Sequence, residues 1–446
     1  MIVLDLEALN EDAVSTAKRL GAEDAIALTA RVRDRMIRFA NSSVTTANHV
    51  EEAELMVYLT KNKKRAIAST SNLESSSVKR FVRDLFDSLK GLPESEYVSL
   101  PDRASKYSPS TLGFDRKLVE VGEELPEFAK TAISASLAAG GNRSAGVIDA
   151  GTIWYAILTS TGTKGSDSRT SITLNIRSFA EKDASGHGLS CSSTLAGFNP
   201  EEAGSRAGRD AKKMRGASEP QPGAYQVLLS PTVAANIVET VGMAASAFSV
   251  DAGTSYLVEK LGKKVADESF NLTDHGTVKG GLGGRVFDDE GTQTRSTPVI
   301  QNGILKTYFH NLTTAKKWKT KSTGSAGLVT PHGWNYEVGA GDSSYEEMVK
   351  EMRRGIILTS NWYTRFKNYR TGEFSTVPRD GAYLVENGRV TRPLKGMRAG
   401  DDLPRMFSSV QLLSKDREWI EWWEVDTPTL CPWMLMDGVK ITRAYE

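Results

Sequence analysis

The chain has 446 residues, more than one hydrophobic core usually organises, so a peptide, a small module or a lone helical bundle is excluded. Hydrophobic residues make up 39% and charged residues 25%, a balance typical of folded proteins and too apolar for disorder. The 56 Lys and Arg residues are balanced by 55 Asp and Glu residues. No net field therefore exists to attract nucleic acid or an anionic membrane surface.

The cysteines and the apolar segments indicate where in the cell the protein is located. Cys191 and Cys431 are the two cysteines, and they form no CxxC pair or disulfide framework, which favours a reducing cytoplasm. The start of the chain, residues 1–7, has no basic region before its acids and does not resemble a signal peptide. Residues 223–250 carry little charge but are too polar for a membrane span. We expect a cytoplasmic protein.

The first hundred residues alternate helix and strand signals. Asn10 could cap a helix over 11–20 that Gly21 ends. Two strands over 55–60 and 65–69, joined by the basic turn 61–64, predict a hairpin. A second helix follows, because apolar residues recur at helical spacing from Val78 to Leu89.

The next hundred residues begin with three prolines within 93–111, which indicate a linker or a long surface connection. After it the patterns predict a helix, three antiparallel strands and a further helix. These elements lie over 127–138 (after Pro126), 153–159, 172–176, near Leu189, and from Asn199-Pro200 onward.

Beyond residue 224 the pattern changes toward β structure, with helices expected only over 231–247 and 344–355. Asn302-Gly303, Asn387-Gly388 and Asp437-Gly438 each separate apolar runs and predict three tight hairpins. We therefore predict an α+β fold, with an N-terminal α/β domain followed by a β-rich C-terminal domain built on a large antiparallel sheet. The expected units are 1–110, a middle α/β region 111–223 that continues the N-terminal lobe, and 224–446.

Motifs of common hydrolases are absent from the sequence. The five histidines, His49, His187, His275, His310 and His332, never approach the spacing of an HExxH zinc site. No G-x-S-x-G serine elbow exists, and a lone cysteine is more often an inert buried residue than a nucleophile.

Four other segments could bind ligands. The glycine-rich run 279–285 could cradle a phosphate, but it fits neither the dinucleotide nor the P-loop template, and a tight turn is the better interpretation. The acids of 288–291 could bind a hard cation, although a solvated turn fits better. Residues 316–321 are basic around one tryptophan and are more typical of a solvated face. The tryptophans and acids of 418–424 could line a groove or an interface, or form a core strand.

The glycine-rich segment belongs to a longer pattern. Residues 261–266, 281–291, 294–295, 302–306 and 322–324 resemble the central block of the TldD and TldE (PmbA) family, and 38–41, 382–388 and 428–430 are similar too. The resemblance covers nearly the whole chain. It implies an N-terminal α/β domain, a β-rich C-terminal domain, and a cytoplasmic TldD/TldE heterodimer that cleaves unfolded or extended peptides.

The family's TldD subunit carries zinc on a helix with His-Glu-x-x-x-His and on a later cysteine. The corresponding residues here are Val238, Glu239 and Met243, so a valine and a methionine stand at the two imidazole positions. Neither side chain replaces an imidazole on zinc. The stretch 415–426, where the family's cysteine would fall, contains none, and Cys431 lies too late. The resemblance thus implies a degenerate motif and no metal in this chain.

The sequence leads to three hypotheses. First, the chain is the TldE-type, non-metal-binding subunit of a cytoplasmic metallopeptidase complex, with zinc in a TldD-like partner and unfolded or extended peptide as substrate. Second, it is a homodimeric peptide-binding protein without catalysis. Third, and least favoured, it is an autonomous metalloenzyme using His275, His310 or His332. Gly281, Gly283, Arg285 and Asp288 are candidate contacts to substrate or to an interface. Neither nucleic acid nor a membrane is expected as a partner.

Overall fold

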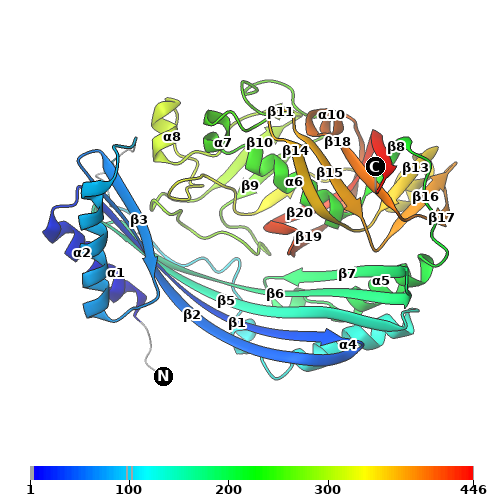
Figure 1. The fold of residues 1–446 in the computed structure, drawn as a ribbon, viewed down its shortest axis with the longest axis horizontal. Helices are drawn as coiled ribbons and strands as arrows, with labels where there is room; N and C mark the ends of the chain where they lie inside the picture. Colours follow the sequence, from blue (N-terminus) through cyan, green and yellow to red (C-terminus); the bar gives the residue numbers. More distant parts are fainter. Residues whose placement is uncertain (1–4, 97–98, 102–103, 445–446) are drawn as a thin grey trace.

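The fold consists of two large sheets, one from each half of the chain (Figure 1). The structure, a computed structural model, describes residues 5–96, 99–101 and 104–444. The first sheet has seven strands in the order β3-β2-β1-β5-β6-β4, with β7 also paired to β6. It curves beneath the second sheet, with α1 and α2 at one end and α4 and α5 at the other (Figure 1).

The elements of the first half are bounded as follows. The strands are β1 (Asp24–Ala40), β2 (Ser43–Lys61), β3 (Lys64–Thr70), β4 (Lys106–Tyr107), β5 (Arg143–Thr159), β6 (Lys164–Glu181) and β7 (Ala184–Ser192). The helices are α1 (Leu6–Leu20), α2 (Ser75–Ser88), α3 (Arg116–Glu120), α4 (Leu125–Ala138) and α5 (Pro200–Lys213), with short 3-10 turns at Leu89–Gly91 and Leu195–Gly197.

Local signals placed most of these elements. The hairpin around residues 61–64, the helix of residues 78–89 and the Pro-led helices α4 and α5 are confirmed. The predicted cap of the first helix is wrong: Asp5 caps it by accepting from the Ala8 amide at 3.1 Å. Asn10 is buried inside the helix and accepts from the Thr29 hydroxyl at 2.6 Å. Gly21 does end α1, in the left-handed region.

Strand length was underestimated. Three strands, β2, β5 and β6, have 17 to 19 residues, whereas the sequence patterns predicted runs of five to seven. The 17-residue strand β1 was not predicted. The extra length alternates half-buried with buried residues along β6, and one face is covered by helices or by the second half of the chain. The expected linker also contains β4, which pairs in parallel with β6 at Lys106 and Tyr107.

The second sheet joins 13 strands and is mostly antiparallel, with parallel pairs only between β8 and β13 and between β12 and β20 among the described residues. Its strands are β8 (Gly223–Leu229), β9 (Leu272–His275), β10 (Ser296–Gln301), β11 (Ile304–Leu305), β12 (Tyr336–Val338), β13 (Arg354–Leu358), β14 (Asn361–Asn368), β15 (Glu373–Pro378), β16 (Ala382–Glu386), β17 (Arg389–Pro393), β18 (Met397–Asp402), β19 (Val410–Trp422) and β20 (Val425–Arg443). The helices are α6 (Pro231–Ala244), α7 (Ala247–Asp251), α8 (Leu312–Lys317), α9 (Tyr345–Glu351) and α10 (Leu403–Ser408). The predicted α+β class is confirmed.

Two of the three predicted hairpins form, at Asn302-Gly303 and at Asn387-Gly388. The third is wrong. β20 runs through Asp437-Gly438, where a bulge shifts its register against β8 between Met436 and Val439 and lets the strand continue. The helix expected over 344–355 ends at Glu351, because the chain enters β13 at Arg354.

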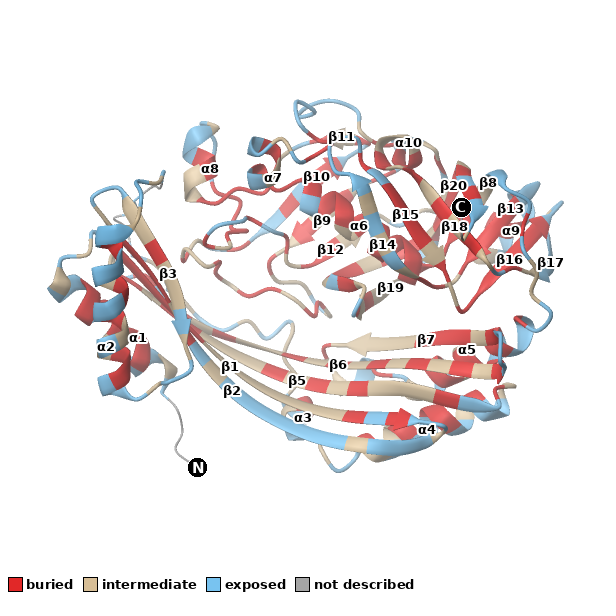
Figure 2. Cartoon of the chain, in the orientation of Figure 1, coloured by how far each residue is buried: buried red, intermediate tan, exposed pale blue. Residues whose placement is uncertain are grey.

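The two halves of the chain are held together by a buried ion pair and a buried hydrogen bond. Asp380, fully buried, accepts from Arg177 at 2.6 Å and from the Ser185 hydroxyl at 2.6 Å, tying β6 and β7 to the loop before β16. Figure 2 shows buried residues concentrated within the second half, while the outer part of β2 is exposed. In the described ranges no helix has the length and apolarity to cross a membrane.

Candidate functional site

Helix α6 carries the degenerate motif and packs against β20. Ser230 caps its first turn and Pro231 occupies its first position, so the helix starts where local chemistry favours a start. Most of its residues are buried. Asn236 and Glu239 lie one turn apart. Asn236 Nδ2 donates to the Glu424 carbonyl, between β19 and β20, at 2.5 Å, and Glu239 bonds to the start of β20.

The three motif positions have different environments. Val238 is fully buried in the core of the second half, and Met243 is 54% exposed. Glu239 Oε1 accepts from the Thr427 backbone amide at 2.6 Å. Burial raises the pKa of Glu239 to about 7, opposed by that hydrogen bond and reinforced by Asp426. The retained acid therefore anchors the start of β20 to the helix.

The glycine of the motif has a packing role. A Cβ on Gly242 would lie 2.0 Å from the hydroxyl oxygen of Tyr336, which is buried beneath α6. Tyr336 is paired in register with Asp274 on β9. Burial raises the pKa of Asp274 to about 7, and its Oδ1 accepts from the amides of Trp334 and Asn335. The floor under the motif is thus closely packed.

The glycine-rich segment is used internally. Gly283 donates its amide to Asn335 Oδ1 at 2.8 Å and accepts from Asn335 Nδ2 at 2.9 Å, and a Cβ there would lie 2.2 Å from the Trp334 carbonyl. Gly281 is also buried and packed against Val278. These amides have partners within the chain, so the interpretation as a close-packed turn fits the geometry. A contact of Gly281 or Gly283 with substrate stays a prediction.

Arg285 is enclosed by aromatic rings. Its guanidinium lies 4.7 Å from the ring centre of Tyr155 on β5 and 5.3 Å from that of Trp334, and it pairs with Asp289. The residue is only 7% exposed. Arg285 therefore braces the contact between the two halves of the chain, and a further contact with substrate stays a prediction.

The solvated turn expected over 288–291 is wrong. Asp288 is fully buried and accepts from the backbone amides of Glu290, Thr292 and Ala326 at 2.8 to 3.1 Å. Because water cannot reach the Asp288 carboxyl, these three amides supply its hydrogen bonds. Burial raises the pKa of this carboxyl. The acid fixes a tight internal turn.

The sequence analysis missed a group of four acids beside α6. Asp34 on β1, Asp149 on β5, Glu421 on β19 and Asp426 on β20 line a cavity of about 320 Å³ between the first sheet and the β19–β20 turn. Gly151, Ser171, Thr173, Trp422, Trp423 and Val425 complete the lining. In the sequence, only the tryptophans and acids of 418–424 indicated such a cavity, because they were expected to line a groove or an interface. Asp34 and Asp149 are single acids outside the predicted strands, and they lie in β1 and β5.

The electrostatics of this acidic cavity follow from burial and repulsion. Burial raises the pKa of Asp149 to about 6, and the nearby Asp34 charge adds to the effect. Burial likewise raises the pKa values of Asp34 and Glu421. Glu421 Oε2 is shielded from solvent and has no hydrogen-bond partner within the described chain.

The other titratable candidates lie apart. His187 is buried between Asn175 and Ser360, which bond its two ring nitrogens, and burial lowers its pKa to about 4. His310 is also buried, and His275 pairs with Glu337 at 3.0 Å. Among the described residues, no three His, Cys, Asp or Glu side chains are grouped as a metal ion requires.

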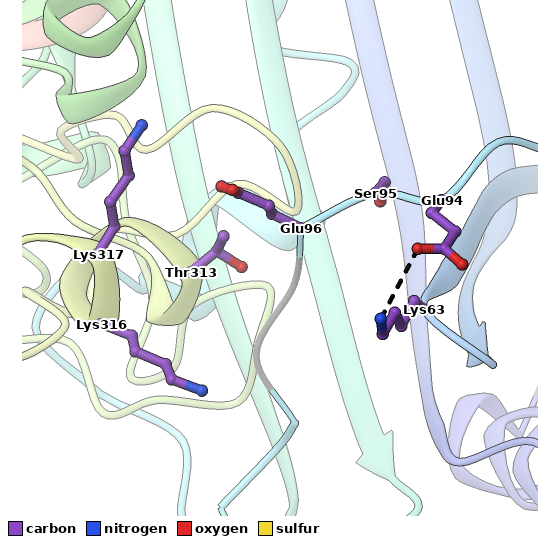
Figure 3. A pocket seen from close by; sticks show the side chains of 7 residues that line it. All are labelled: Lys63, Glu94, Ser95, Glu96, Thr313, Lys316 and Lys317. Atoms are coloured by element: carbon purple, nitrogen blue, oxygen red, sulfur yellow. Dashed lines mark ion pairs between the residues drawn. The ribbon is translucent and has the colours of Figure 1, made fainter.

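A wider cavity of about 710 Å³ lies between the β2–β3 turn and α8 (Figure 3). Lys63, Lys316 and Lys317 line it together with Glu94 and Glu96, and Lys63 pairs with Glu94 at 3.8 Å. Both partners of that pair are largely exposed, so it contributes little. Mixed charges in an open cavity agree with the solvated face expected for 316–321.

Three family models match the chain in succession. They describe domain 1, the central domain and the C-terminal domain of the PmbA/TldA metallopeptidases, and they match residues 30–89, 121–215 and 222–443. The chain belongs to the PmbA/TldD family. The three matches fall on the first sheet's β1 to α2, on the α4 to α5 region, and on the second sheet.

Curated members of the PmbA/TldD family share part of this sequence. A metalloprotease of Methanocaldococcus jannaschii is 34% identical over 206 residues, 44% of each chain. The metalloprotease PmbA of Escherichia coli O157:H7 is 29% identical over 211 residues, 46% of this chain and 45% of that one. The aligned region thus spans less than half the length of these relatives.

Solved structures share the whole fold. A crystal structure from Thermotoga maritima, titled as a candidate modulator of DNA gyrase, has a TM-score of 0.87 at 23% identity and covers 98% of this chain and 100% of that one. TldE from Thermococcus kodakarensis has a TM-score of 0.86 at 19% identity, covering 97% and 100%. At these identities the likeness establishes the fold, which is that of TldE.

The residues on α6 do not fit the zinc that the family name implies. A buried valine and an exposed methionine supply no imidazole, and Glu239 is engaged by the Thr427 amide. Cys431 is fully buried in β20, where burial strongly raises the pKa of its thiol. We therefore derive no metal-dependent step for this chain.

Proposed function

We propose that this chain is the non-metal-binding, TldE-type subunit of a cytoplasmic TldD/TldE-type peptidase that acts on unfolded or extended peptides. The observation that carries the proposal is the state of α6. The family helix is retained, yet its metal positions are Val238 and Met243, and its acid anchors β20. A TldD-like partner then supplies the zinc, and this subunit shapes the chamber.

The long edge of β2 supports a role in binding extended chains. Its residues 43–54 have no strand paired on the outer side in the described structure, since β3 pairs only with 55–61. Val44 and Val50 are exposed there. An uncovered edge offers backbone groups to another extended segment, from a peptide or a subunit. Both cysteines are free, which agrees with a reducing cytoplasm.

The test is elemental analysis and peptide cleavage by the purified chain, alone and mixed with a TldD-like protein from the same cell. We expect zinc near one per heterodimer and cleavage only in the mixture. One zinc per isolated chain would overturn the assignment. A stable homodimer that binds peptide and never associates with a TldD-like protein would favour the non-catalytic binding protein instead.

An Arg285→Ala variant separates bracing from substrate contact at the glycine-rich segment. In the assembled complex, unchanged peptide turnover together with lower stability of the chain is expected for a brace. A loss of turnover at unchanged stability would instead assign Arg285 to the substrate.

A further inference from the structure

The acidic cavity has features of a ligand site beyond its charge. Asp34, Gly151 and Ser171 are direct cross-strand neighbours on β1, β5 and β6, and Asp149 and Thr173 form the next such pair on β5 and β6. All five line the cavity. Gly151 leaves the centre of this floor bare, since a Cβ there would only reach ordinary contact with Ser171 Oγ at 3.5 Å and Asp34 Oδ1 at 3.7 Å.

The opposite wall comes from the turn between β19 and β20. Glu421 and Asp426 face the cavity from the two strands, and Trp422 and Trp423 lie between them in the sequence. Trp422 packs against His187, with 4.8 Å between ring centres and the rings tilted by 37°, whereas Trp423 is 55% exposed. The wall thus combines two carboxylates with an accessible indole.

The four carboxylates lack cationic partners. In the described part of the chain, none of the four takes part in an ion pair, although Arg38, Arg169 and His49 influence them through space. A buried carboxyl group such as that of Glu421 is costly without a partner, whereas Asp426 is exposed. Glu421 Oε2 has no hydrogen-bond partner among the described residues, so a donor from a ligand could satisfy it.

Beside the cavity is an aromatic rim. Trp362 and Trp423 lie 5.8 Å apart between ring centres, and Tyr363 is 49% exposed. Tyr363 adopts a φ of 59°, unusual for an aromatic residue, and its amide donates to Glu424 Oε1 at 2.9 Å. The tether to Glu424 holds this exposed aromatic residue close to Trp423, which lines the cavity.

We propose that the acidic cavity binds a basic side chain, preferably the guanidinium of an arginine, of a bound peptide. The inference rests on the proposed peptide-binding function and names the kind of residue the subunit selects. A planar guanidinium can bond to carboxylates and stack on an indole at once, which an ammonium does less well. The aromatic rim then contacts the residues that flank the arginine.

The test is calorimetric titration of the full chain with the peptide acetyl-Ala-Ala-Arg-Ala-Ala-amide and with its citrulline counterpart, at pH 7.5 and low salt. Citrulline keeps the shape of arginine without the charge. We expect the arginine peptide to bind roughly tenfold more tightly than the citrulline peptide. A third peptide with lysine at the same position should bind with intermediate affinity. Glu421→Gln and Asp149→Asn should each remove most of this preference, and Gly151→Leu, which fills the floor, should weaken both peptides.

Glu386→Gln is the matched control, because Glu386 is an exposed acid at the end of β16 outside the cavity lining. It should leave the preference unchanged. Equal affinity for the two peptides overturns the proposal and leaves the proposed function intact. If neither peptide binds, the proposal of an arginine site is also overturned. The proposed function is then still decided by the zinc and cleavage measurements on the mixture with a TldD-like protein. Displacement of the arginine peptide by calcium, lost in Glu421→Gln, would reassign the cavity to a metal ion.

Discussion

Replacing Glu239 by glutamine tests whether this acid is structural. Burial raises its pKa from an ordinary 4.5 to about 7. Such a change corresponds to about 3 kcal/mol, since one pKa unit is worth about 1.4 kcal/mol. Because the folded-state pKa lies above the unfolded one, the favourable contribution is complete below about pH 4.5 and is lost as the pH rises through 7.

Glutamine keeps the oxygen that accepts from the Thr427 amide but never ionises. We therefore expect Glu239→Gln to match the parent chain near pH 5 and to exceed its free energy of unfolding by up to about 3 kcal/mol at pH 8.5. Other buried acids with raised pKa values, such as Asp274, occur in both proteins and cancel in the difference.

The measurement is urea unfolding followed by tryptophan fluorescence at pH 5, 6.5 and 8.5. Glu386→Gln serves as the exposed control and should show no pH-dependent difference from the parent. If Glu239→Gln is instead less stable at pH 8.5 than at pH 5 relative to the parent, Glu239 is ionised in the fold. The reasoning would then fail, and a role as a base would have to be reconsidered.

Two further predictions concern packing and thiol chemistry. Gly242→Ala should lower the free energy of unfolding by about 1–3 kcal/mol, because its Cβ would overlap Tyr336, whereas Gly91→Ala, with open space around it, should change little in the same urea assay. Cys431 should react with a thiol reagent at pH 8 only after denaturation, since it is fully buried and burial strongly raises its thiol pKa; rapid labelling of Cys431 in the native chain would contradict this.

The elements that the sequence predicted are those with local signals. Gly21, the Asn-Gly turns and the prolines before α4 and α5 act within a few residues of themselves, and each was located correctly. Asp437-Gly438 has the same local signal as a hairpin turn, but pairing with β8 and β18 on either side keeps β20 extended. Long-range pairing overrides a turn propensity that a single strand cannot reveal.

The residues of the candidate site also differ in how far they could be predicted from local sequence. The degenerate motif could be located because the family resemblance rests on one continuous segment, and Val238, Glu239 and Met243 all lie on α6. The acidic cavity could not, because Asp34 and Asp149 meet Glu421 only when β1, β5 and β19 are assembled. The burial of Asp288 was missed for a related reason: one of its three donors, the Ala326 amide, comes from a distant loop.

The unusual length of the strands in the first sheet gives the protein a regular series of positions for side chains. Along an extended strand, side chains on the same face recur about every 6.6–6.8 Å. The floor of the acidic cavity occupies only a short part of β1, β5 and β6, each at least 17 residues long. Substitutions two residues along could therefore move an acid by about 7 Å while the backbone stays unchanged. Such substitutions would shift an acidic cluster along the sheet without requiring a new fold.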